Sequence, residues 1–216
     1  MKSPARSPNR SFEEEILPLY KEKKAAIHGR LEEFRRVPRK EYFYELAYCL
    51  LTPQSSAIHA ERTVEHLHQA DFLGRGFDPE SLLRTPSQYI RFHRTKARHL
   101  LAAREQFPEI ARVLSVPASP PDLREWLVQN VKGLGYKEAS HFLRNIGRNE
   151  GLAILDRHIL KNLKKHGVIR SVPSSLTRKR YFAIERRFRN FADRIGIPID
   201  ELDLLFWSFE TGEIRK

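Results

Sequence analysis

Cysteine is nearly absent from this chain of 216 residues, in which Cys49 is the single example. One thiol cannot close an intramolecular disulfide, and it cannot hold an iron–sulfur cluster, which usually needs four thiolates. Because Cys49 lies in the apolar stretch of residues 46–51, we expect a small buried side chain rather than a nucleophile. The near absence of cysteine fits a reducing, intracellular setting.

Long hydrophobic runs are also lacking. No segment approaches the ~18 consecutive apolar residues that a transmembrane helix needs, so we expect no membrane association. The first residues, MKSPAR, have no apolar stretch behind them, which argues against a signal peptide. No group of His, Cys and carboxylate residues has the spacing of a metal site, so we expect no catalytic metal.

Acidic residues are the minority among the charged ones. The chain carries 39 Lys and Arg against 27 Asp and Glu, which gives a formal net charge of +12 and a pI of about 10.0. Such a balance favours a polyanionic partner, most often nucleic acid. A basic protein that is merely soluble would show the same composition, so charge alone does not decide.

Convincing strand patterns and internal repeats are missing too, so the fold is predicted to be all-α. Residues 1–10 are predicted to be a disordered basic tail, followed by one domain over residues 11–216. A proline-rich stretch at 117–121 is the predicted boundary between helical subdomains, with the N-terminal helices packing on the C-terminal part. The expected helices cover about residues 11–37, 41–51, 56–69, 87–106, 122–131, 137–149, 157–166, 176–195 and 199–210.

The most distinctive pattern present is VKGLGYKEA at residues 131–139, which predicts a turn between two helices. Gly133 and Gly135 allow a tight turn and a close approach of the backbone to a phosphate. The helix that follows adds its positive end. An ordinary helix–helix turn with a C-terminal glycine is the alternative, but the pair of glycines beside a lysine favours a DNA-binding hairpin.

Lys137, at the start of that helix, has two interpretations. It could contact a phosphate, or it could be a nucleophile that attacks a sugar carbon and forms a Schiff base. Attack needs a neutral amine, which the helix N-terminus favours and a nearby Asp156 would oppose. Asp156 itself could cap the helix beginning at Arg157, or stabilise charge and relay protons, and the two roles are compatible.

Three further segments carry side chains suited to opened DNA. Arg91 and Phe92 begin a cationic stretch that is either a solvated helix face or a grip on DNA, with Phe92 as a wedge. Gln54 could fill the space left by an extruded base or be an ordinary loop residue. Trp207, in an apolar C-terminal segment, is either a core residue or a wall on which a flipped base stacks.

Two sequences, GLGYKEASHFLRNIG at 133–147 and ILDRHIL at 154–160, together resemble the helix-hairpin-helix superfamily of DNA glycosylases. They are most similar to the type 2 8-oxoguanine DNA glycosylase/lyases of archaea and some bacteria. LTPQ at 51–54, residues 91–97 and the short C-terminus also match, so the resemblance spans nearly everything after the tail. The chain lacks the four-cysteine cluster of the endonuclease III and adenine-glycosylase branches, and we expect no counterpart of the β-rich N-terminal domain of the eukaryotic 8-oxoguanine enzymes.

This resemblance implies two helical subdomains that hold DNA and an extruded base in the cleft between them. It implies that Lys137 is the Schiff-base nucleophile and that Asp156 is its catalytic partner. It also implies that Trp207 packs on the damaged base, and that Lys216 reads the base through its terminal carboxylate or its side chain.

The resemblance further places Gln54, Arg91 and Phe92 near the opened helix, with Gly133 and Gly135 on the DNA backbone. We thus expect a monomeric bifunctional glycosylase and lyase acting on double-stranded DNA with 8-oxoguanine, in the cytoplasm at the nucleoid. No cofactor is expected beyond a monovalent cation at the glycine turn. The alternatives are a glycosylase for another oxidised base and a non-catalytic helix-hairpin-helix DNA-binding module.

Overall fold

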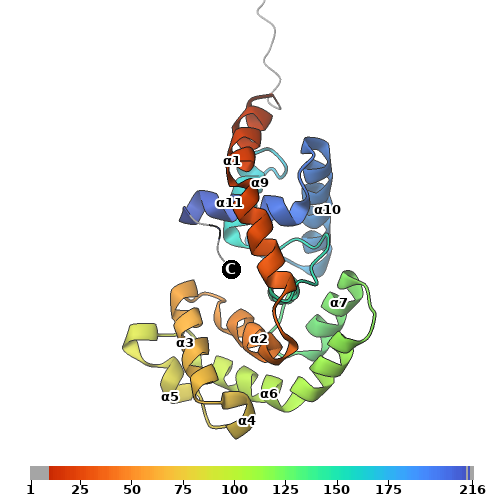
Figure 1. Cartoon of the computed structure of the whole chain (residues 1–216). Coiled ribbons are helices and arrows are strands. Elements are labelled where there is room, and N and C mark those ends of the chain that lie inside the picture. Colours follow the sequence, from red (N-terminus) through yellow and green to blue (C-terminus); the bar gives the residue numbers. More distant parts are fainter. Residues whose placement is uncertain (1–9, 213, 215–216) are drawn as a thin grey trace, which may run out of the picture. The chain divides into compact units, whose positions relative to one another are not determined.

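A computed structural model of the chain describes residues 10–212 and 214, and every regular element in this part is a helix (Figure 1). The all-α fold class predicted from the sequence is therefore confirmed. The chain divides into two compact units, one of Met1–Arg35 with Glu150–Lys216 and the other of Arg36–Asn149. None of the helices in the described part combines the length and the apolar composition needed to cross a membrane.

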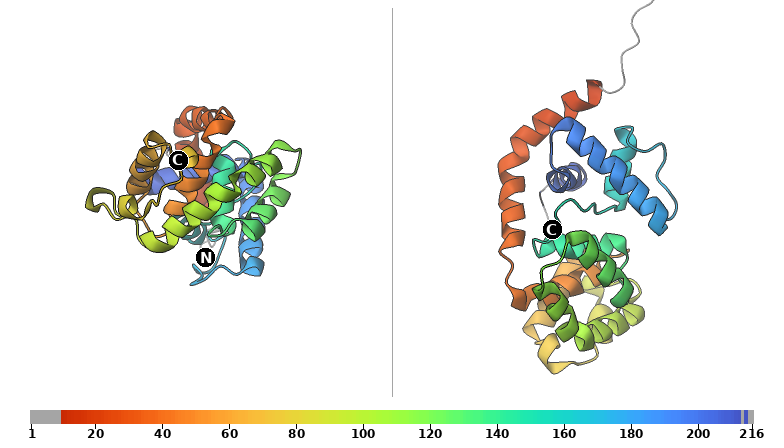
Figure 2. Two further views of the ribbon diagram at one scale, coloured as in Figure 1. Left: turned by 90° about the horizontal axis from the view of Figure 1, so that it is seen from below. Right: turned by 90° about the vertical axis from the view of Figure 1, so that its right-hand side faces the viewer.

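The first unit joins the N-terminal helix to the C-terminal ones. It contains α1 (Arg10–Arg35), α9 (Arg157–Lys165), α10 (Arg178–Ile195) and α11 (Ile199–Thr211). The apolar helix α11 packs against α1, α9 and α10, which makes it the centre of this unit (Figures 1 and 2). Tyr20 on α1 donates a hydrogen bond to Glu201 on α11 at 2.5 Å, and this bond adds to the packing of the two helices.

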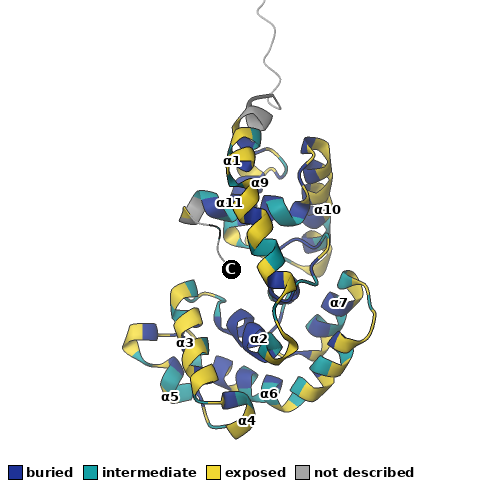
Figure 3. Cartoon of the chain, viewed as in Figure 1, coloured by how far each residue is buried: buried dark blue, intermediate teal, exposed yellow. Residues whose placement is uncertain are grey.

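The second unit is built around α2 (Tyr42–Leu51), of which all residues but the first are buried (Figure 3). Against α2 pack α3 (Ala57–Gln69), α6 (His93–Ser115) and α8 (Tyr136–Asn145). Cys49 lies in this helix and is fully buried, as predicted. The remaining elements are η1 (Arg39–Glu41), α4 (Phe72–Arg75), α5 (Glu80–Leu83), η2 (Pro86–Gln88) and α7 (Pro120–Asn130).

The unit boundaries fall at residues 35/36 and 149/150, which differs from the boundary predicted near 117–121. The proline-rich stretch instead lies inside the second unit, between α6 and α7. Ser119 caps α7 by accepting a hydrogen bond from the Asp122 amide at 3.3 Å, and Pro120 occupies the first helical position. These prolines start a helix, a position that their fixed φ suits, and do not separate two units.

Helix α6 also differs from the prediction of a helix over 87–106. It begins only at His93, because Phe92 has a φ of +61° that no helix accommodates. It then continues through Pro108 to Ser115, with Ile110 and Leu114 buried beyond the proline. The short elements α4, α5, η1 and η2 were not predicted, since four residues or fewer are too short to show a period.

Candidate functional site

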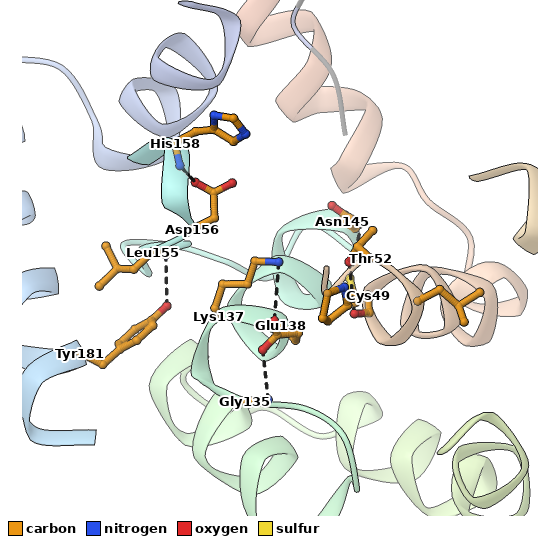
Figure 4. Close-up of polar contacts among 12 residues, drawn as sticks. Cys49, Thr52, Gly135, Lys137, Glu138, Asn145, Leu155, Asp156, His158 and Tyr181 are labelled. Atoms are coloured by element: carbon orange, nitrogen blue, oxygen red, sulfur yellow. Dashed lines mark hydrogen bonds and ion pairs between the residues drawn. The ribbon is translucent and has the colours of Figure 1, made fainter. Parts of the chain in front are cut away.

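The turn between α7 and α8 has the geometry that its glycines predicted. Gly133 has a φ of +96°, and a Cβ at this residue would lie 2.4 Å from the His99 Nδ1 atom on α6. Gly133 is therefore required both for its backbone conformation and for the close approach of α6. Gly135 is the N-cap of α8 and donates its N–H to Glu138 Oε2 at 3.2 Å (Figure 4).

The start of α8 is suited to an anion. The first amides of a helix lack intrahelical acceptors, and the helix dipole places partial positive charge at this end. Lys132 lies exposed in the turn, and burial, together with Lys132 and other nearby cations, lowers the pKa of His99. Because His99 is neutral, the positive charge near the turn comes from the lysines and from the backbone amides at the start of α8.

Lys137 lies in the first turn of α8, as its second residue and one position after the predicted helix start, and its side chain is only 23 % exposed. Its Nζ atom lies 3.6 Å from Glu138 Oε1, while the other oxygen of the same carboxylate accepts the Gly135 amide (Figure 4). Glu138 thus ties the lysine to the turn. The sequence interpretation missed this role, although a glutamate three residues after a helix N-cap is the usual signal for it.

Gln54 and Phe92 occupy two neighbouring loops of the second unit. Both have left-handed backbones, with φ of +55° and +61°, and both are exposed. The loops are linked because the Arg91 amide donates to Ser55 Oγ at 3.0 Å, and the Arg91 guanidinium lies 4.8 Å from the centre of the Phe92 ring. The structure therefore brings together the three residues that the sequence singled out as candidates to contact opened DNA.

Asp156 belongs to the first unit and is the N-cap of α9. Its Oδ1 atom accepts a hydrogen bond from the His158 amide at 2.8 Å (Figure 4). It also accepts one from the Ile159 amide at 2.8 Å, so the capping interpretation is confirmed. The buried segment before it is anchored on α10, where the Tyr181 hydroxyl donates to Ala153 O at 2.6 Å. The carboxylate is consequently held in one orientation.

Trp207 lies on α11 and is only partly buried, unlike its fully buried neighbour Phe206. Its indole Nε1 donates to Asp156 Oδ2 at 2.8 Å, and its ring lies 5.3 Å from the His158 ring. The structure thus joins Trp207 to Asp156, a link that no local pattern in the sequence indicates. Lys216, which was predicted to recognise the damaged base, lies outside the described residues.

Lys96 is a second residue that the sequence interpretation missed. It stood within the cationic stretch that begins at Arg91, yet its side chain is buried beneath the two loops that carry Gln54 and Phe92. Nothing in the local sequence indicates this burial, because Lys96 stands among polar and basic residues near the start of a helix. Among the described residues, no group of three or more His, Cys, Asp or Glu side chains is placed to hold a metal ion.

Comparison with known proteins shows consistent similarity to one family. A family model described as 8-oxoguanine DNA glycosylase matches residues 27–197. The 8-oxoguanine DNA glycosylase/AP lyase of Fusobacterium nucleatum is 39 % identical over 211 residues, covering 94 % of this chain and 96 % of that protein. The enzyme of the same name from Korarchaeum cryptofilum is 41 % identical over 191 residues, covering 88 % and 90 %.

Solved structures are similar as well. The crystal structure of the 8-oxoguanine DNA glycosylase of Thermotoga maritima aligns with a TM-score of 0.83 at 31 % identity, covering 96 % of this chain and 99 % of that one. The Methanocaldococcus jannaschii 8-oxoguanine glycosylase/lyase, in complex with a 15mer DNA containing 8-oxoguanine, also aligns with a TM-score of 0.83. Its identity is 32 %, and the alignment covers 95 % of this chain and all of that chain.

Proposed function

This chain belongs to the helix-hairpin-helix family of 8-oxoguanine DNA glycosylases, and on that premise we propose that it excises 8-oxoguanine from duplex DNA and then cleaves the strand as an AP lyase. The observation that carries the proposal is Lys137 at the second position of α8, partly buried directly after the glycine turn. A phosphate held at that helix start would bring the sugar of the bound strand close to the amine. Such an enzyme would act as a monomer on DNA of the nucleoid.

Lys137 supplies the nucleophile in the proposed reaction. Its neutral amine attacks C1′, the bond from C1′ to the base breaks, and the base leaves with the electron pair and takes up a proton. Opening of the sugar ring then gives an imine between Nζ and C1′. The imine acidifies the C2′ proton, whose removal expels the 3′ phosphate by β-elimination and cuts the strand.

Asp156 is proposed to stabilise the positive charge that develops on the sugar and to relay protons. Three N–H groups donate to its two oxygens, so the carboxylate does not have to reorient as charge develops. The indole of Trp207, which supplies one of those hydrogens, is proposed to pack on the extruded base. Lys216 is proposed to read the base.

No catalytic metal has a step in this mechanism. The monovalent cation expected at the turn would be held by backbone carbonyls, of which Val131 O already accepts the Leu134 amide at 3.2 Å. Its proposed role is to orient the turn toward a phosphate.

Borohydride trapping tests the proposal, because the imine can be reduced to a stable enzyme–DNA adduct. We expect the native chain to be trapped on a duplex with 8-oxoguanine, and Lys137→Gln to abolish the adduct. Lys132→Gln is the matched control, since it removes an exposed lysine of the same turn; at saturating protein it should still be trapped. An adduct that persists in Lys137→Gln would refute the nucleophile assignment.

Two other outcomes identify the alternatives. Stronger trapping on a duplex with an oxidised pyrimidine would show that the enzyme serves another lesion. If no lesion gives an adduct, the chain is a DNA-binding module in which Lys137 only contacts phosphate. In that case Lys137→Gln would lower the salt dependence of binding by roughly one unit of slope.

A further inference from the structure

The loops that carry Gln54 and Phe92 hold unfavourable backbone conformations. Only three non-glycine residues in the described part of the chain have positive φ, and Gln54 and Phe92 are two of them. Such conformations persist where surrounding contacts impose them, and they concentrate at functional sites. The contacts that impose these two therefore decide where the exposed side chains point.

One buried ammonium group lies beneath both loops. Lys96 on α6 is 5 % exposed, and its Nζ atom donates to Leu51 O at 2.6 Å, to Pro53 O at 2.7 Å and to Ser55 Oγ at 3.0 Å. An ammonium has three hydrogens, so every one of them is used. The acceptors follow the chain from the end of α2 to the residue after Gln54.

The same hydroxyl extends the contact to the second loop. Ser55 Oγ also accepts the Arg91 amide at 3.0 Å, and Arg91 immediately precedes Phe92. Phe92 O in turn accepts the Lys96 amide in the first turn of α6. Lys96 is thus connected to one loop directly and to the other through Ser55 and through its own helix.

We propose that Lys96 is a positioning residue, whose ammonium sets the shape of both loops so that Gln54 and Phe92 can enter the duplex where a base has been extruded. This inference rests on the proposed function, because it assigns a role within base extrusion. It differs from the roles of Lys137 and Asp156, since Lys96 is given no contact with the reacting sugar.

A role in stability alone does not explain a cation here. The three acceptors of Lys96 are neutral, and a buried charge without a carboxylate partner is costly. The pKa of Lys96 is lowered to about 8, mainly by burial and to a smaller extent by the neighbouring Lys137 cation, while Glu138 opposes the shift. An apolar residue at this position would avoid the cost of burying a charge. It would, however, leave without donors the three acceptors that converge on this point, and so would not hold the loops in their present shape.

The test compares duplex opening with chemistry that does not need it. Lys96→Met keeps the length of the side chain and removes its donors. We expect base extrusion, measured by the fluorescence of 2-aminopurine beside the lesion, and excision from duplex to fall at least about tenfold. Borohydride trapping on single-stranded abasic DNA should stay within about twofold of the native level, because no helix has to be opened.

Arg104→Met is the matched control. Arg104 lies on the same helix and donates in the same way to the carbonyls of Phe72, Leu73 and Gly74, but it holds a different loop. We expect it to lower the melting temperature without a selective loss of extrusion. Ser55→Ala removes only the shared acceptor and should reduce extrusion in the same direction, which keeps the test decisive if Lys96→Met does not fold.

Two results would overturn the proposal. One is an equal loss of extrusion and of single-strand trapping, which would mean a general structural role. The other is native extrusion by both Lys96→Met and Ser55→Ala. Both results differ from the failure of the proposed function. In that case the native protein itself would give no adduct, either on duplex DNA with 8-oxoguanine or on single-stranded abasic DNA.

Discussion

Asp156 caps α9, and we propose that the same carboxylate stabilises charge in the reaction; substitution can separate these two roles. Asn is as good an N-cap as Asp, so Asp156→Asn leaves an oxygen for the His158 and Ile159 amides but removes the charge. Its amide nitrogen would then face the Trp207 indole, which donates to the present Oδ2 at 2.8 Å, so that two donors meet. Asp156→Ala removes the charge and all three hydrogen bonds.

The expected losses of stability differ between the two variants. Loss of a cap costs ~1 kcal/mol, and an indole N–H left without its acceptor adds ~1–2 kcal/mol. Asp156→Ala should therefore be destabilised by about 2–3 kcal/mol, and Asp156→Asn, which keeps the cap but not the acceptor for the indole, by about 1–2 kcal/mol. For a chain of this length each kcal/mol lowers the melting temperature by roughly 2–4 °C.

The expected losses of activity are instead alike. If the charge of Asp156 stabilises the transition state, both variants should lose about 10²-fold or more in single-turnover excision, measured well below either melting temperature. Thr177→Ala is the control, because Thr177 caps α10 by accepting the Arg180 amide at 3.4 Å and carries no charge. It should lose ~1 kcal/mol and keep its activity. An active Asp156→Asn would refute the catalytic role and leave Asp156 as a cap.

Three further predictions follow from single positions. Gly133→Ala should cost about 2–3 kcal/mol in thermal unfolding and weaken DNA binding, because Ala at a φ of +96° is strained and its Cβ meets His99; native affinity would contradict this account. Lys96 has a pKa of about 8 folded against 10.5 unfolded, so the unfolded chain binds more protons between these pH values. Native stability should therefore rise across that window by about 3 kcal/mol relative to Lys96→Met, measured by urea unfolding, and parallel curves would exclude the shift. Deleting Lys216 should weaken discrimination between 8-oxoguanine and guanine more than DNA binding, and equal losses in a competition assay would argue against its role in recognition.

The cap at Asp156 and the turn at Gly133 were predictable because their signals are local. A carboxylate before a helix reaches amides two and three residues ahead, and a tight turn needs glycine whatever surrounds it. For the same reason the sequence predicted that Lys137 lies at the start of a helix, which is α8 in the structure. The helical period likewise predicted the all-α class, since helices bury one face at a spacing that the sequence displays directly.

Other features had no local signal. The φ of Phe92 delays the start of the helix predicted over 87–106, because Ser55 accepts the amide of Arg91, 36 residues later, and so fixes the backbone before α6. The proline stretch at 117–121 looked like a boundary, yet the units are defined by which helices share a core, and α1 shares one with α11.

By itself the sequence determined the helical class, the glycine turn, the position of Lys137 and the cap at Asp156. Each of these depends on groups within about four residues, where chain geometry leaves few arrangements. Only the tertiary structure decided that Trp207 donates to Asp156 across 51 residues, and that Lys96 donates to the loop around Gln54, 41 to 45 residues away. Such contacts depend on how distant helices pack, and the residues that make them look like any other lysine or tryptophan in the chain.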